Sequence, residues 1–258
     1  MTCYPWFERV TRKWWFYLII LLVQFLPPYP VKGITSSQDV NRLVEEILSR
    51  ALVLSWRSLY PVFKIVPLLF LALLVFFPKS RPIFYLFVAF HYLIFAFFQN
   101  TAFLENRGFT MLTSNVVMIT LVALSFFGEV FARKSASSFG RMDWKKVLVV
   151  GVAMFAFFYP VDPVSLQPRF RFEDLLTNAA GLTFCMMTPF YLMILLLTYP
   201  KVNLVTLRVT GLVGAIIGGY NVFLNFCFDF PHLWWNGVLH LPLLVISGYA
   251  LRLSLKRD

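Results

Sequence analysis

Eight apolar runs divide this chain, and each is long enough, or nearly long enough, to cross a lipid bilayer as a helix. A membrane-spanning helix needs about 20 mainly apolar residues to cross about 30 Å of hydrocarbon. Only structures that satisfy their backbone hydrogen bonds internally are stable there. The sequence therefore predicts an all-α polytopic transmembrane helical bundle that forms one integral membrane domain over residues 1–258. The predicted spans are residues 14–28, 61–77, 82–99, 109–127, 146–161, 178–199, 205–228 and 233–251.

The composition excludes an ordinary soluble fold and a nucleic-acid-binding protein. Hydrophobic residues make up 59% of the chain and charged residues 14%, whereas a soluble domain has about 45–50% apolar and 25% charged residues. The net charge of +11 resides in short segments between the apolar runs. A nucleic-acid interface would instead gather basic residues in a patch on a soluble domain. The expected partner is the lipid bilayer, and no nucleic acid is expected.

The basic residues also predict an orientation. If the amino terminus lies in the cytoplasm, the inner segments contain 15 basic and 4 acidic residues, and the outer segments contain 8 of each. The entire net charge then falls on the inner side. Because Lys and Arg in short loops favour the cytoplasm, the sequence predicts eight spans with both termini inside, in a multi-pass protein of the plasma membrane.

The longest outer segment contains an amphipathic pattern over residues 37–57. Apolar residues recur at helical spacing from Val40 to Leu52, with polar residues between them. We expect a continuous helix on the outer surface, with Leu43, Ile47 and Leu48 against protein or lipid and Glu45 towards water.

Polar side chains within the predicted spans gather in the outer half of the bilayer. Such groups are costly in hydrocarbon and usually face the bundle interior or a wet cavity. The i, i+4 spacing of several of them places each set on one helix face. We predict an outward-facing polar pocket lined by Gln99, Asn100, Asn115, Asn221, Asn225, Asn236 and His240. Alternatively, the same groups join helices through hydrogen bonds.

The run 205–228 contains several small residues at helical spacing. Gly214 and Gly218 form a small-xxx-small pair, as do Ala215 and Gly219. Such pairs let two helices approach backbone to backbone. Close packing is the simpler expectation, and a hinge is the alternative.

Three short segments resemble the motifs of a family of intramembrane proteases. They are Glu45-Glu46-x3-Arg50, Phe87-x3-His91 and His232-x3-Asn236, and the family is the CAAX-protease and bacteriocin-processing family. The resemblance implies that these glutamates and histidines activate a water. The interval from His91 to His232 is longer than in that family's pattern, so this interpretation is an alternative.

Other chemistry is only weakly indicated. His91 and His240 lie at similar depth, which is the minimum for a bis-histidine haem, so a histidine-dependent redox protein is a second enzymatic alternative. No cysteine stands at a metal-binding spacing, and the sequence leaves the cofactor unknown. Cys185 and Cys227 suit buried thiols or a disulfide.

Three functions remain open at this stage. The first is binding or transport of a small molecule or lipid headgroup in the polar pocket. The second is an accessory or structural subunit of a membrane complex. The third is an intramembrane enzyme with His91, His232, His240, Glu45 or Glu46 as weak catalytic candidates.

Overall fold

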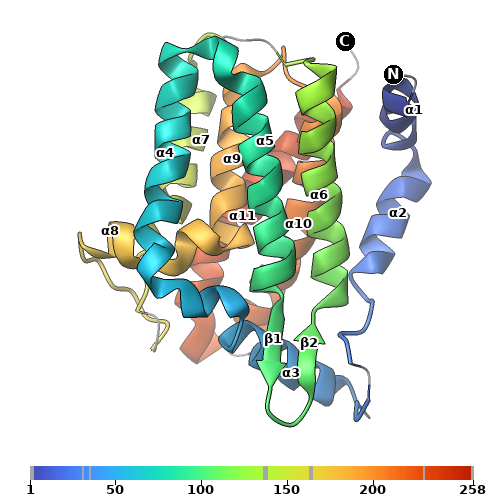
Figure 1. The fold of residues 1–258 in the computed structure, drawn as a ribbon, viewed down its shortest axis with the longest axis vertical. Coiled ribbons are helices and arrows are strands. Elements are labelled where there is room, and N and C mark those ends of the chain that lie inside the picture. Colours follow the sequence, from blue (N-terminus) through green and yellow to red (C-terminus); the bar gives the residue numbers. More distant parts are fainter. Residues whose placement is uncertain are drawn as a thin grey trace.

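The computed structural model describes residues 3–30, 32–34, 36–135, 139–162, 165–228 and 230–256, and it shows a bundle of helices with a small hairpin at one end (Figure 1). Both termini lie at the opposite end, which we call the terminal end; the other is the hairpin end. In chain order the elements are α1 (Cys3–Val10), α2 (Trp14–Val23), α3 (Ser37–Ser49), η1 (Leu52–Leu59), α4 (Tyr60–Phe76), η2 (Pro78–Ser80), α5 (Arg81–Ile94), η3 (Phe95–Gln99), β1 (Thr101–Leu104), β2 (Gly108–Met111), α6 (Thr113–Ala132), α7 (Trp144–Phe158), α8 (Asp174–Thr177), η4 (Ala179–Leu182), α9 (Phe184–Thr198), α10 (Leu204–Cys227) and α11 (Phe230–Leu255).

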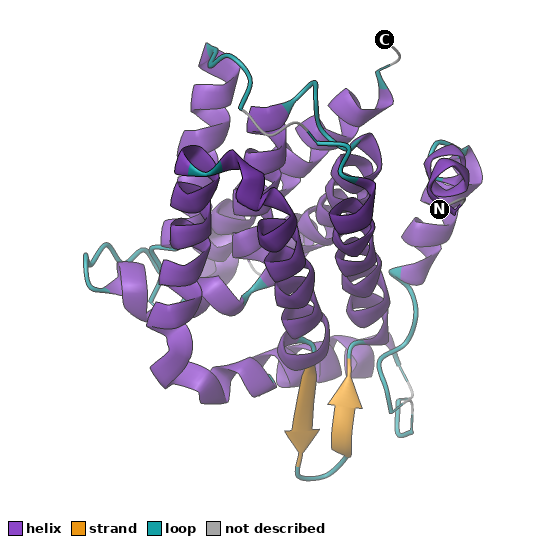
Figure 2. Ribbon diagram, turned by 45° about the horizontal axis from the view of Figure 1, so that its top comes forward, coloured by secondary structure: helices purple, strands orange, loops and turns teal. Residues whose placement is uncertain are grey.

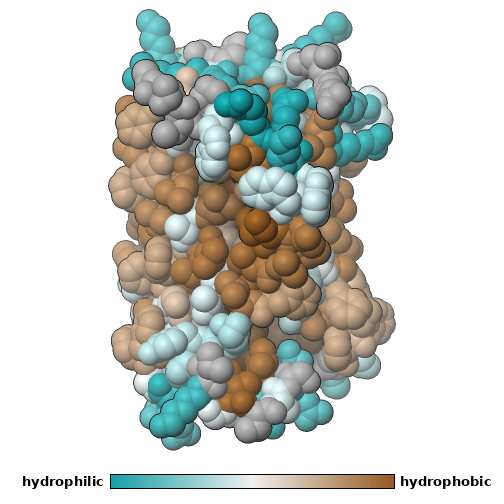
Figure 3. Space-filling model, turned by 90° about the vertical axis from the view of Figure 1, so that its right-hand side faces the viewer, coloured by the Kyte–Doolittle hydropathy of each residue, from teal (hydrophilic) through white to brown (hydrophobic). Residues whose placement is uncertain are grey.

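The helices confirm a multi-pass membrane protein. Among the described residues, five helical segments are long and apolar enough to cross a membrane, and a sixth is obtained if one bent pair is a single span. On the face shown in Figure 3, apolar side chains cover the middle of the molecule, with polar residues above and below them. The count of eight spans and the orientation remain predictions. The first predicted span, 14–28, is helical only over the 10 residues of α2.

A β-hairpin replaces the start of one predicted span. Strands β1 and β2 pair antiparallel, with Thr101 opposite Met111 and Leu104 opposite Gly108 (Figure 2). Gly108 adopts a φ of +68°, which suits glycine at the tight turn. The helix predicted from residue 109 therefore begins only at Thr113. An apolar run alone does not distinguish a short strand from the first turn of a helix.

The outer amphipathic segment is also divided. Ser36 caps the start of helix α3, and its hydroxyl accepts the Asp39 backbone N–H at 3.2 Å. The helix buries Leu43 and Ile47, whereas Leu48 and Glu45 are exposed. It ends at Ser49, whereas a continuous helix over 37–57 was expected. Ala51 is extended and the 3₁₀ segment η1 follows, so the chain turns towards α4.

The predicted span 178–199 is broken as well. The segment Asp174–Leu182 meets Phe184–Thr198 at a bend of 90°. Thr183 is extended at the break. The turn before it packs on α4 so closely that a Cβ atom on Gly181 would lie 2.7 Å from the Phe63 carbonyl oxygen.

Two cations, buried Arg208 and partly buried Lys146, stabilise helix ends. Arg208 on α10 is wholly buried and donates to the Ser254 carbonyl at 2.7 Å and to the Thr11 hydroxyl at 2.8 Å. Lys146 donates to the Leu197 carbonyl at 3.2 Å. The last carbonyls of a helix lack partners within the helix and carry partial negative charge. These cations therefore cap α11 and α9 in a setting where water is scarce.

Candidate functional site

A cavity of about 190 Å³ lies at the hairpin end, between η1 and the adjoining ends of the bundle helices. The end of α3, the turn after it and the start of η1 contribute an apolar cover of Leu48, Ala51, Val53 and Leu54. The remaining lining residues are Gln99, Asn100, Asn115, Ile119, Tyr159, Thr183, Phe184, Cys185, Met186, Ile217, Asn221 and His240. Five of the seven residues predicted for the pocket thus line this cavity.

One side of the cavity is built from η3 and α6. The amide of Asn115 donates to Oδ1 of Asn100 at 2.7 Å, and Nδ2 of Asn100 donates to the Phe95 carbonyl at 2.8 Å. Oε1 of Gln99 accepts the backbone N–H of Phe184 at 2.8 Å and so caps α9. These bonds fix the orientation of the three amides. Nε2 of Gln99 and Oδ1 of Asn115 have no protein partner among the described residues.

The opposite side belongs to α10 and α11. Nδ2 of Asn221 donates to the Ile217 carbonyl at 2.8 Å, which leaves Oδ1 without a partner in the described part of the chain. Nδ1 of His240 lies 2.7 Å from the Asn236 carbonyl. A carbonyl can only accept, so Nδ1 must donate its proton. In the neutral ring, Nε2 is then a hydrogen-bond acceptor.

The two other predicted pocket residues bind one another. Nδ2 of Asn236 donates to Oδ1 of Asn225 at 2.8 Å, and Nδ2 of Asn225 donates to the Asn221 carbonyl at 2.7 Å. Neither residue belongs to the cavity wall. Their contact joins α10 to α11 just beyond the cavity.

The sequence analysis overlooked Lys64 as an intramembrane charge. Its side chain is wholly buried, donates to the Phe157 carbonyl and lies over the Phe157 ring, 4.4 Å from the centroid. Asn178 caps the next carbonyl, Phe158 O, at 2.7 Å. Together these side chains bind the last carbonyls of α7. Tyr159 follows the helix in a left-handed conformation, with φ 50°. A single lysine within the apolar run 61–77 was the signal that could have revealed this residue.

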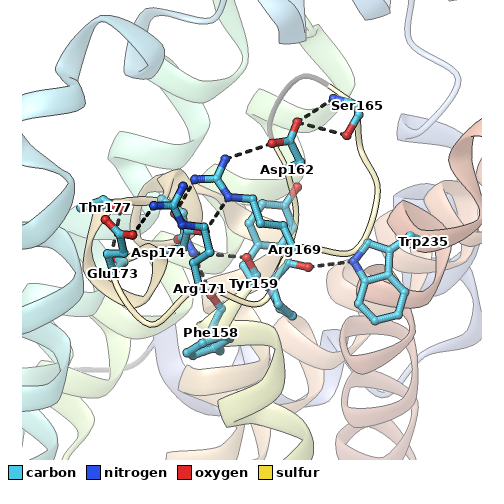
Figure 4. A network of polar contacts seen from close by, with 12 residues as sticks. Phe158, Tyr159, Asp162, Ser165, Arg169, Arg171, Glu173, Asp174, Thr177 and Trp235 are labelled. Atoms are coloured by element: carbon cyan, nitrogen blue, oxygen red, sulfur yellow. Dashed lines mark hydrogen bonds and ion pairs between the residues drawn. The ribbon is translucent and has the colours of Figure 1, made fainter.

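An ion-paired loop covers the same end of α7. Arg169 contacts Asp162 at 2.9 Å and Asp174 at 3.0 Å, and the Trp235 indole donates to the Pro160 carbonyl at 2.8 Å (Figure 4). This network holds the connection between α7 and α8 against α11. It thereby positions Tyr159 on the cavity wall.

The weak catalytic candidates are dispersed. His91 is buried, its Nδ1 contacts the Tyr191 hydroxyl at 2.5 Å, and its ring lies 4.4 Å from that of Phe95. Glu45 and His232 are exposed, and Glu46 is partly exposed. The described residues contain no group of three His, Cys, Asp or Glu that could hold a metal ion. Cys185 and Cys227 are free thiols rather than a disulfide.

Comparison with known proteins does not assign the chain to a family. The chain matches no protein-family model, no curated protein and no solved structure. The case for a function therefore depends on the geometry of the site.

Proposed function

We propose that this multi-pass membrane protein binds a small uncharged polar molecule, or the uncharged polar part of a lipid headgroup, in the cavity at the hairpin end. One observation supports this proposal above all. Polar side chains from η3, α6, α10 and α11 converge on one space, and each is held by one protein hydrogen bond while a second polar atom lacks a partner in the described chain.

The lining chemistry defines the ligand class. Among the described residues of the wall there is no Asp, Glu, Lys or Arg. A charged ligand would be transferred from water without a counter-charge, which is costly. Asn115, Asn221 and His240 offer acceptors and Gln99 offers a donor. A hydroxyl- or amide-bearing ligand with several donors would satisfy them.

The volume limits the ligand's size. At about 30 Å³ per water in the liquid, a cavity of about 190 Å³ corresponds to about six water molecules. Drug-sized ligands occupy about 300–1,000 Å³. A glycerol-sized molecule is the scale that fits.

Binding is favoured over transport. Beyond the cavity, towards the terminal end, the interior is filled by wholly buried aromatic side chains, including Tyr92, Phe126 and Tyr191. Their rings contact one another, with Tyr92 and Phe126 stacked at 5.4 Å. Packed rings support a site that is reached from one side only.

Cys185 provides a direct test because it lies on the cavity wall. In a chain with Cys3→Ser and Cys227→Ser, iodoacetamide should alkylate Cys185 in the folded protein. Asn221→Leu should fill the cavity and slow that reaction at least tenfold, whereas Asn41→Leu, an exposed change on α3, should not. Glycerol, urea and acetamide should be tested as protecting probes. A rate of alkylation unchanged by Asn221→Leu and by every probe would contradict the proposal.

The alternative is an accessory or structural subunit of a membrane complex. The Asn225–Asn236 contact favours it, because two amides that bond each other serve helix packing and need no ligand. In that case Asn221→Ala should lower thermal stability, and the small probes should not stabilise the wild-type protein.

A further inference from the structure

A second and larger cavity, of about 540 Å³, lies at the terminal end. It is bounded by α1, by the chain that leaves α6, and by the connection from α9 to α10. Its wall carries three cationic side chains, Arg133, Lys134 and Lys201, and Glu8 is the one carboxylate among the described lining residues. Most of its lining residues lie in the connections between helices rather than within the apolar spans.

The charges of this cavity are not balanced. Nζ of Lys134 contacts Glu8 at 2.8 Å, so this pair is neutral overall. Arg133 and Lys201 form no ion pair within the described ranges. Two cationic residues without an ion pair therefore line a hollow that is large enough for a small anionic group.

The wall is held in place from beneath. Arg133 ends α6 in a left-handed conformation with φ 49°, and the chain turns sharply after it. The Ser135 backbone N–H donates to buried Glu129 at 2.8 Å, and the Asn203 backbone N–H donates to the Ser135 hydroxyl at 3.0 Å. Glu129 also accepts from the Asn203 side chain. These bonds tie the two connections together and place the cations without a bound ligand.

The start of α10 adds to the positive potential. Leu204, the first residue of this 24-residue helix, lies on the cavity wall. Oδ1 of Asn203 caps the Val205 N–H at 3.0 Å, and the partial positive charge at the helix N-terminus still attracts anions. An arginine fork, a lysine and a helix start together match the oxygens of a phosphate group.

We infer that this cavity binds a phosphate group, supplied either by an anionic phospholipid of the adjacent leaflet or by a small soluble phosphate compound. Basic pockets at the membrane surface bind anionic lipid headgroups in this way. This site shares no lining residue with the neutral cavity, which lies at the other end of the bundle.

The test compares two sources of phosphate on the full chain. The protein is reconstituted in phosphatidylcholine nanodiscs with or without 20% phosphatidylglycerol, and separately titrated in detergent with glycerol 3-phosphate. The variant Arg133→Gln/Lys201→Gln removes both unpaired cations. The matched control is Arg141→Gln/Lys145→Gln, which removes two exposed cations outside the cavity wall, one just before α7 and one in its first turn.

We expect the cavity variant to bind its phosphate source about 30-fold more weakly, which corresponds to about 1 kcal/mol per cation near a membrane surface. The control should lose less than threefold. In pure phosphatidylcholine, the thermal midpoint of the cavity variant should match that of the wild type, which shows that the variant folds. Selective binding of phosphatidylglycerol identifies a lipid headgroup, and binding of glycerol 3-phosphate identifies a soluble compound. Equal losses in both variants, or no binding by the wild type in either arm, would overturn the inference.

Discussion

Gly211 on α10 lies against Leu251 on α11, and a Cβ atom added to the glycine would meet the Leu251 backbone nitrogen at 2.9 Å. Gly218 is similarly close to the Leu244 nitrogen, at 3.0 Å. The small residues of α10 therefore allow the two helices to touch along their backbones, as their spacing predicted.

This contact makes glycine substitutions informative. Gly211→Ala should lower the free energy of unfolding by about 1–3 kcal/mol, because one helix must move away from the other. Gly219→Ala is the control, since its Cβ would meet only Leu244 Cδ1 at 3.8 Å, an ordinary contact. Unfolding of both variants in detergent micelles measures the difference. Equal stability of the two would contradict backbone contact at Gly211.

Asn178 should be difficult to replace. It donates to the carbonyls of Phe158 at 2.7 Å and Tyr159 at 3.2 Å, and it accepts the Ala180 N–H at 3.1 Å. Asn178→Ala should cost about 1–3 kcal/mol, the usual penalty for leaving buried polar groups without partners. Asn178→Asp should cost at least as much despite its equal size, because it replaces the donor. Thermal melts test this, with the exposed Asn106→Ala as a control expected to change stability by less than about 0.5 kcal/mol.

The Asn225–Asn236 contact can be measured with a double-mutant cycle. Asn225→Ala, Asn236→Ala and the double variant should give a coupling energy of about 0.6 kcal/mol, and at most about 1.7 kcal/mol, as for other hydrogen bonds between membrane helices. The bond distance of 2.8 Å predicts a favourable sign. Strictly additive losses would mean that the two amides do not bond in the membrane.

Reporter fusions test the orientation. The termini and the connections after η2, α6 and α9 belong to one end of the bundle in Figure 1. Fusions after residues 80, 140, 202 and 258 should therefore all report the same compartment, and the charge distribution predicts the cytoplasm. A fusion within the hairpin, after residue 106, should report the opposite compartment. If the carboxyl-terminal fusion disagrees with the others, the number of spans is odd.

The terminal end should show a modest dependence on pH. The hydrogen bond from Lys134 holds the pKa of Glu8 below its ordinary value of 4.5. A lowered folded-state pKa contributes stability above the unfolded-state value, and this contribution is lost as the pH falls through the folded-state value. At pH 7 the free energy of unfolding of the wild type should exceed that of Glu8→Gln by about 0.2–1 kcal/mol, since the Glu8–Lys134 pair is partly exposed. The difference should begin to shrink near pH 4.5 and vanish below it.

The control for this titration is Glu105→Gln at the exposed hairpin turn, where no ion pair occurs in the described chain. The difference in free energy of unfolding between Glu105→Gln and wild type should stay small and constant from pH 7 to pH 3. Salt at 1 M should reduce the Glu8 effect, because exposed charges are screened. A Glu8 difference that grows on acidification would contradict the ion pair.

Much of the membrane architecture followed from local pattern. Apolar length placed α4, α5, α10 and α11 close to their observed positions, because hydrocarbon thickness sets helix length regardless of neighbours. The i, i+4 spacing of Asn221 and Asn225 placed both on one face of α10, since helix geometry is local. The glycines of α10 were interpreted correctly as a packing surface for the same reason.

Tertiary contacts decided the remainder. The hairpin exists because Thr101–Leu104 meets Gly108–Met111 across a turn, and apolar content is equally consistent with a helix there. Lys64 is tolerated in the interior because the end of α7, almost a hundred residues later, offers it a carbonyl. Gln99 and Asn115 line the same cavity as His240 only because distant helices return to one level. Helical periodicity specifies which face a side chain occupies, but the partner of that face depends on how distant segments pack.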